Sequence, residues 1–109
     1  MASPKSAQNT IDMLVLTILS RRGASHGYGI ANAIQDLSDD ALRVDEGSLY
    51  PALHRMEEAG WIKAEWEVTE NKRRARVYRL NRAGEKQLAA ERARWDQFSK
   101  GVARVLQHA

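Results

Sequence analysis

The hydrophobic period of the chain changes near its middle, and this change constrains the fold more than any other feature. Before residue 60, apolar residues recur every three or four positions in three segments, which is the spacing of amphipathic helices. From Ile62 to Val68, apolar and polar residues alternate, as they do in a half-buried strand. A helical period returns from Arg82 onward. The predicted order is therefore three helices, a short β segment and a final helix.

The β segment has the pattern of a hairpin. The polar stretch ENKRR separates the alternating residues from ARVYRL, in which Val77 and Tyr78 favour a strand. We therefore expect a mainly α fold with a small two-stranded hairpin whose tip is basic. The predicted fold class is a winged helix-turn-helix domain plus one long C-terminal helix.

The first two helices are marked by their ends. Residues 1–9 are polar and are predicted to be a disordered tail, and Asn9 or Thr10 can cap a helix that ends at Gly23. Apolar residues cover nearly the whole circumference of that helix, so we expect it to be buried on most sides. The second helix follows Ser25 as its cap. Its two glycines, at 27 and 29, favour a close approach of the backbone to a neighbour.

The third helix lies in VDEGSLYPALHRMEEAGWI and stops at Gly60. Its apolar stripe consists of Leu49, Leu53 and Met56. Proline is harmless only in the first turn of a helix, where the backbone N–H groups have no partners. Pro51 therefore predicts a helix that starts close to Gly47 or Ser48, with Ser48 as its cap.

The final helix, capped by Asn81, is predicted to run from Arg82 to about Leu106. Its length, roughly 35–40 Å, exceeds the width of a domain of this size. Its apolar stripe therefore extends past its own core, and a second copy of the chain is the simplest partner. We divide the chain into the tail 1–9, a winged helix-turn-helix domain 10–81 and a dimerisation helix 82–109.

Composition restricts the class of protein. A chain of 109 residues suits one domain, and it has no Cys, so neither disulfides nor thiolate metal sites stabilise it. The N-terminus lacks the apolar core of a signal peptide, and the apolar run at residues 13–19 is too short to cross a bilayer. We expect a cytoplasmic protein with no membrane partner.

Charge is distributed unevenly along the chain. The net charge is only +3, but NKRRARVYRLNRAG, residues 71–84, holds six Lys or Arg and no acid. A basic block of this kind on a structured segment points to a polyanion such as DNA. Charge alone leaves a solvated charged face equally open.

The motifs resolve this choice. GSLYPALHRMEEAGWI, the preceding HGYGI, the hairpin ending VYRLNRAG and the terminal helix resemble PadR-type transcriptional regulators from about Ile11 to Leu106. The lone C-terminal helix is similar to the short subgroup of that family. The resemblance implies a homodimeric repressor that binds a palindromic operator through the third helix and the basic wing. It also implies release by a small aromatic ligand at the dimer interface.

The predicted DNA contacts lie on the third helix, the wing and the front of the second helix. Hydroxyl groups of the third helix can bind phosphates near its N-terminus, and cations can bind guanine edges or phosphates. The predicted residues are Tyr28, Ser48, Tyr50, Pro51, His54, Arg55, Lys72, Arg73, Arg74 and Arg76.

The predicted dimer and ligand interface comprises Leu14, Leu88, Trp95, Phe98 and Val102. The resemblance implies that Trp95 lines a flat pocket for planar ligands, since stacking needs rigid aromatic faces. The alternative is that Trp95 only fills the interface between two copies. Trp61 and Trp66 are predicted to pack the hairpin against the helices.

Two other functions are alternatives to DNA binding. An enzyme is disfavoured because the three His residues sit on separate elements, and no phosphate loop, metal-ligand cluster or cofactor motif is present in the sequence. A winged-helix module that binds protein instead of DNA is the second alternative, because a fold does not fix a function. A basic wing favours DNA over a protein partner.

Overall fold

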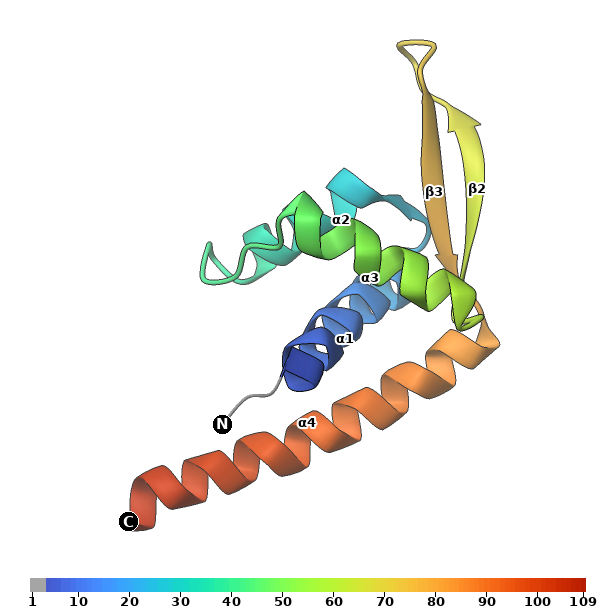
Figure 1. Cartoon of the computed structure of the whole chain (residues 1–109). Coiled ribbons are helices and arrows are strands. Elements are labelled where there is room, and N and C mark those ends of the chain that lie inside the picture. The colour runs from blue at the N-terminus through green and yellow to red at the C-terminus, as the bar shows by residue number, and fades with distance from the viewer. Residues whose placement is uncertain (1–3) are drawn as a thin grey trace.

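The computed structural model describes residues 4–109, with side chains from Thr10 onward. The chain forms four helices and a small antiparallel sheet, whose β2–β3 hairpin projects from the helices (Figure 1), and this confirms the predicted winged helix fold with a long C-terminal helix. In chain order the elements are α1 (Pro4–Arg22), β1 (Ser25–His26), α2 (Gly27–Leu37), α3 (Glu46–Glu58), β2 (Ile62–Val68), β3 (Arg74–Leu80) and α4 (Arg82–His108).

The first helix starts earlier than predicted. It begins at Pro4, so residues 4–9, which were predicted to be disordered, are helical, and residues 1–3 lie outside the described part. Its end is as predicted: Gly23 has a φ of 80°, and its N–H donates to the carbonyl of Leu19 at 3.1 Å. A positive φ at this position is adopted most easily by glycine.

The sheet has three strands rather than the predicted two, in the order β1-β3-β2. The third strand is very short: Ser25 pairs with Tyr78 and His26 pairs with Val77. Ser25 was predicted to cap α2, but its backbone pairs with β3, and His26 takes the N-cap position without a side-chain cap. Two residues are too few to show a period, so no sequence pattern predicts this strand.

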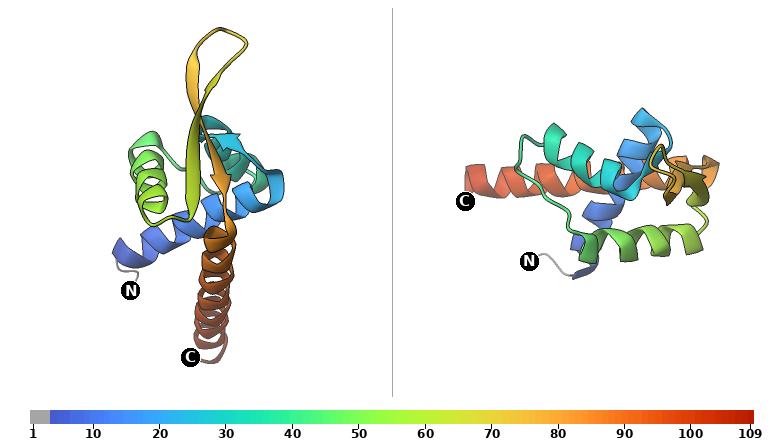
Figure 2. Two further views of the ribbon diagram at one scale, coloured as in Figure 1. Left: turned by 90° about the vertical axis from the view of Figure 1, so that its right-hand side faces the viewer. Right: turned by 90° about the horizontal axis from the view of Figure 1, so that it is seen from above.

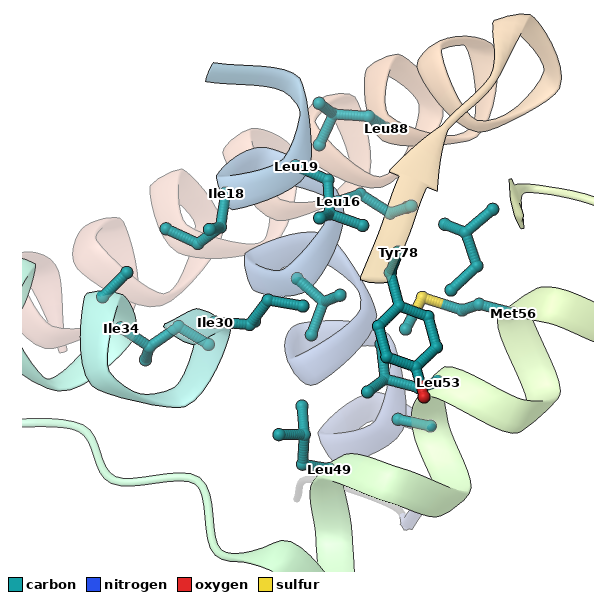
Figure 3. Packing of buried hydrophobic residues seen from close by; sticks show 14 residues of the cluster. Leu16, Ile18, Leu19, Ile30, Ile34, Leu49, Leu53, Met56, Tyr78 and Leu88 are labelled. Atoms are coloured by element: carbon teal, nitrogen blue, oxygen red, sulfur yellow. The ribbon is translucent and has the colours of Figure 1, made fainter. Parts of the chain in front are cut away.

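The middle of α1 lies at the centre of the core. Val15, Leu16, Ile18 and Leu19 are at most 5% exposed, as the all-round apolar pattern predicted. Figure 3 shows side chains from α2, α3, β3 and α4 converging on this segment. Leu88 of α4 belongs to this core, so its prediction as a residue of the dimer interface is wrong. Leu14 is partly buried and packs against the same core.

The start of α3 also differs from the prediction. Asp45 is the N-cap, and its carboxylate accepts a hydrogen bond from the N–H of Ser48 at 2.8 Å. Ser48 is therefore inside the first turn, and Pro51 lies in the second turn, inside the helix. There it removes the hydrogen bond that the carbonyl of Gly47 would otherwise accept. The helix tolerates this loss because Pro51 and Gly47 are both exposed to water.

The end of α3 is joined to the start of α4. Gly60 has a φ of 82°, and the N–H groups of Gly60 and Trp61 donate to the carbonyls of Glu57 and Met56, which is a Schellman motif. Asn81 caps α4 as predicted, accepting from the N–H of Gly84 at 2.8 Å. Its amide Nδ2 donates to the carbonyl of Gly60 at 2.7 Å, so one side chain stabilises both helix ends.

The long helix α4 packs on α1 with its first half and extends beyond the core with its second half. The molecule measures 57 × 29 × 23 Å as a result. Figure 2 shows the C-terminal half of α4 projecting past the other elements. Within residues 4–109, no helix combines the length and the apolarity needed to cross a bilayer.

Gly84 is a position where α4 closely approaches the rest of the chain. A Cβ there would lie 2.2 Å from the carbonyl oxygen of Trp61 and 2.3 Å from Cδ1 of Leu80. We predict that Gly84→Ala lowers the free energy of unfolding by about 1–3 kcal/mol, the usual range for overpacking. Urea denaturation followed by circular dichroism measures this change.

Gly29 provides the matched control, because it is also helical and a Cβ there meets nothing within 4 Å. Gly29→Ala should raise the free energy of unfolding by about 0.5–1 kcal/mol through helix propensity. Equal effects of the two substitutions would contradict the close approach at Gly84.

Candidate nucleic-acid interface

The β2–β3 hairpin (residues 62–80) is the wing of this fold. The wing, α3 and the N-terminal end of α2 border a groove. This groove lies on one side of the molecule, and α4 lies on the opposite side (Figure 1). The groove has a volume of about 470 Å³ and collects aromatic, basic and histidine side chains from elements far apart in the sequence. Its lining consists of His26, Gly27, Tyr28, Tyr50, His54, Glu57, Trp66, Arg74, Ala75, Arg76 and Tyr78.

The ring of Tyr50, on α3, lies against Gly27 at the start of α2, and both residues line the groove. A Cβ on Gly27 would lie 2.9 Å from the Tyr50 hydroxyl, so a larger residue there would require the Tyr50 ring to shift. The predicted close approach is therefore confirmed at Gly27, whereas Gly29 faces open space. Tyr50 keeps 44% of its surface exposed, and Tyr28, which stacks on His26, is also exposed.

The remaining predicted residues of α3 divide between two sides of the helix. His54 lines the groove, is exposed, and lies 3.0 Å from the carboxylate of Glu58 one turn later. Ser48 and Pro51 are exposed but do not line the groove. The carboxylate of Asp45 already occupies the backbone N–H of Ser48, so a phosphate does not have that donor available.

Arg55 points toward α1 rather than into the groove. Its Nη2 donates to Oδ1 of Asp12, which is buried on α1. Burial raises the pKa of Asp12, the charge and hydrogen bond of Arg55 oppose this rise, and the nearby carboxylate of Glu91 adds to it. Removing one partner of such a pair would leave a buried charge uncompensated. Arg55 thus joins α3 to α1, a contact that the sequence did not predict.

The tip of the wing is a tight turn that carries cations. The N–H of Thr69 donates to the carbonyl of Arg73 at 2.8 Å, and the N–H of Lys72 donates to the carbonyl of Thr69 at 2.9 Å. Lys72 has a φ of 58°, a left-handed conformation that ends three-residue hairpin loops. Lys72, Arg73 and Arg74 are all exposed, as expected for contacts to phosphates.

Trp66 is 59% exposed, so the prediction that it packs the hairpin against the helices is wrong. Its ring lies beside two guanidinium groups, 4.7 Å from that of Arg74 and 5.5 Å from that of Arg76. Trp66 and Arg76 are cross-strand partners in the β2–β3 register. The alternating pattern correctly placed Trp66 on one face with Ile62, but cations rather than the core cover that face near the tip. Trp61, by contrast, packs partly buried against the core, as predicted.

Arg76 connects the wing to α3. Its Nη2 donates to Oε2 of Glu57 at 3.0 Å, and its carbonyl lies 3.3 Å from Nδ1 of His26. The Nε of Arg76 is buried and has no hydrogen-bond partner among the described residues. Arg76 was predicted to contact DNA, and the structure shows its guanidinium engaged within the chain. Glu57, Trp66 and His26 are residues of the groove that the sequence did not identify.

A second pocket, of about 340 Å³, lies between α1 and α4. It is lined by Thr10, Met13, Glu91, Arg94, Trp95, Gln97 and Phe98. The rings of Trp95 and Phe98 are 6.0 Å apart and tilted by 38°. Glu91 is buried and accepts hydrogen bonds from Gln87 and Arg94, both at 2.7 Å.

Two of the residues predicted for the dimer and ligand interface, Trp95 and Phe98, line this pocket. Val102 lies farther along the same helix, 42% exposed. Within residues 4–109, no group of three or more His, Cys, Asp or Glu lies close enough together to hold a metal ion.

Known proteins share both the sequence pattern and the fold. Transcriptional regulator Rv3488 of Mycobacterium tuberculosis is 38% identical over 68 residues, which are 62% of this chain and 63% of that protein. The aligned segment thus spans less than two thirds of that relative. A transcriptional regulator from Clostridium thermocellum has 28% identity and a TM-score of 0.82, covering 92% of this chain and 96% of its own.

A PadR family transcriptional regulator from Eggerthella lenta has 28% identity and a TM-score of 0.77, over 96% of this chain and 88% of its own. Residues 15–90 match the family described as the transcriptional regulator PadR-like family. That range includes the whole of α2, α3 and the wing. The chain therefore belongs to the PadR-like family of transcriptional regulators.

Proposed function

We propose that this PadR-like regulator is a homodimeric repressor that binds double-stranded DNA with the face that carries α3 and the wing. The observation that carries the proposal is the meeting of three elements at one groove, with exposed cations at the wing tip. A helix and a basic hairpin on the same face match the major groove and the neighbouring phosphates of a duplex.

The exposed side of α3 supplies the contacts to base edges. Ser48, Tyr50 and His54 offer hydroxyl and imidazole groups, and Pro51 offers an apolar surface for the methyl group of thymine. Tyr28, at the front of α2, lies where a hydroxyl reaches the phosphate backbone. Arg55 is left out of this set, because its guanidinium is paired with Asp12.

The wing supplies sequence-independent affinity. Lys72, Arg73 and Arg74 would neutralise phosphates and release counterions, so binding should weaken as salt rises. A winged-helix module that binds protein would present an apolar or mixed tip instead. The charged tip therefore favours DNA as the partner.

The exposed half of α4 supplies the dimer contact. Its large apolar side chains face solvent in the single chain: Trp95, Phe98, Val102, Val105 and Leu106. An apolar stripe of this size marks an interaction surface. A second copy related by a twofold axis would cover it and would present two copies of α3 to a palindromic operator.

The pocket beside Trp95 is proposed to hold a small planar aromatic effector. Met13, Trp95 and Phe98 supply apolar contact area for a ring, and the pocket lies at the edge of the proposed dimer surface. An effector bound there would shift α4 against its partner and alter the spacing of the two α3 helices. Release from the operator follows from that shift.

The wing contacts are tested by replacing Arg73 and Arg74 together with Ala. Affinity for every duplex should fall, and the slope of log affinity against log salt should decrease by about 2, because two phosphate contacts are lost. Lys86→Ala with Arg92→Ala, both exposed on α4, removes the same charge as a control. Wild-type affinity that does not change with salt would exclude the DNA interface.

The dimer is tested by Phe98→Ala, which removes a ring that is 56% exposed in the single chain. Sedimentation analysis should show a dimer dissociation constant raised about tenfold or more, as for a central aromatic anchor. Leu37→Ala, at a similarly exposed apolar residue on α2, should leave it unchanged. Sequences selected from random duplex DNA by the wild-type protein should be palindromes.

The effector pocket is tested by titrating the protein with a planar acridine dye and following Trp fluorescence. Quenching should persist in Trp66→Phe, whose ring lies on the wing, and should be lost in Trp95→Ala. Quenching that survives in Trp95→Ala would place the dye elsewhere.

A further inference from the structure

The outer half of the wing has little support from the helices. Residues 65–68 of β2 are all exposed, and the hairpin stands clear of the helices in Figures 1 and 2. From residue 66 to residue 75, every hydrogen bond that the structure describes is internal to the hairpin. The angle between the wing and α3 therefore depends on contacts nearer to its base.

Arg76 makes the outermost of these contacts. Its guanidinium binds Glu57 on the last turn of α3 at 3.0 Å, and both side chains are about one third exposed, 37% and 31%. Its ring neighbours are Trp66 on β2, at 5.5 Å, and Tyr78 on β3, at 5.9 Å. The guanidinium thus pairs with α3 and lies beside rings from both long strands of the wing. It therefore restrains the wing relative to α3.

Glu57 has an unfavourable charge for its location. It lines the groove on the face that is proposed to bind DNA, where a carboxylate repels phosphates. The ion pair with Arg76 compensates this charge within the chain. The ion pair with Arg76 therefore explains why a carboxylate lies at this position.

Trp66 acts on a second arginine as well. Its ring lies 4.7 Å from the guanidinium of Arg74, one of the exposed cations proposed to bind phosphate. A cation over an aromatic face is held by the ring quadrupole. A side chain ordered before binding loses less rotamer freedom when the complex forms.

We propose that Glu57 and Trp66 are positioning residues for DNA binding, which fix the wing relative to α3 through Arg76 and pre-order Arg74 for a phosphate. This rests on the proposed DNA-binding function. Neither residue needs to touch DNA for its removal to weaken binding. Ordering one side chain at an interface costs about 0.5–1.5 kcal/mol. Removal of Glu57 or of Trp66 should therefore weaken operator binding about three- to tenfold.

Glu57→Ala tests this role, because repulsion of DNA and positioning of Arg76 predict opposite changes in operator affinity. If the carboxylate only repels DNA, its removal should tighten binding. If it positions Arg76, its removal should weaken operator binding about three- to tenfold. Glu67→Ala removes the same charge from an exposed site on β2 and should tighten binding slightly. Tighter binding by both variants would overturn the role of Glu57.

A double-mutant cycle shows whether Glu57 acts through Arg76. In an Arg76→Ala background the added Glu57→Ala change should cost no further affinity, because the pair is already broken. An equal loss in both backgrounds would mean that Glu57 acts independently of Arg76. Thermal unfolding of each variant confirms that the fold is retained.

Trp66 is tested by comparing Trp66→Leu with the conservative Trp66→Phe. The Leu variant should bind operator about three- to tenfold more weakly, with the salt slope changed by less than about 0.5, because no phosphate contact is lost. The Phe variant should recover most of the affinity, since it keeps an aromatic face. A slope that falls by about 1 in Trp66→Leu would mean that a wing cation has lost its phosphate, and unchanged affinity would overturn the proposal.

The salt dependence of wild-type binding distinguishes a failure of this proposal from a failure of the DNA-binding function on which it rests. Wild-type affinity that is independent of salt would contradict DNA binding itself. Salt-dependent wild-type binding that both Glu57→Ala and Trp66→Leu leave intact would contradict only the positioning roles.

Discussion

The burial of the middle of α1 is the constraint on which the other elements depend. Val15 and Leu16 are fully buried, and α1 contacts α2, α3, β3 and α4. Burial of apolar surface supplies most of the driving force for folding, and here one helix collects it from all sides. Because α1 lies between them, α3 and the wing occupy one side of the molecule and α4 the other.

One ion pair and one neighbouring charge link α1 to α3 and α4. Asp12 of α1 holds Arg55 of α3, and Glu91 of α4 is near enough to raise the pKa of Asp12 further. The same Glu91 lines the pocket beside Trp95. Asp12 therefore lies between a cation of α3 and a carboxylate that lines the pocket.

The sequence pattern predicted most of the fold and about half of the residues that line the groove. Periodicity found the four helices and the hairpin, and the caps at Asn81 and Gly60 were predicted correctly because they depend on local chemistry. Pro51 suggested the wrong cap for α3, because the N-cap is Asp45, three residues before the predicted cap Ser48. The sequence predicts free cations at Arg55 and Arg76, because it does not show which carboxylate packs against each of them.

Sequence alone determined which residues are apolar, how they repeat and where cations gather, and these are properties of neighbours along the chain. It thus specified the helices, the hairpin and the basic tip of the wing. Tertiary structure decided which cations remain free. Arg55 meets Asp12 across 43 residues and Arg76 meets Glu57 across 19, and these pairs exist only once α1, α3 and β3 pack together. Lys72 and Arg73, at the unsupported tip, keep the exposure that their sequence predicted.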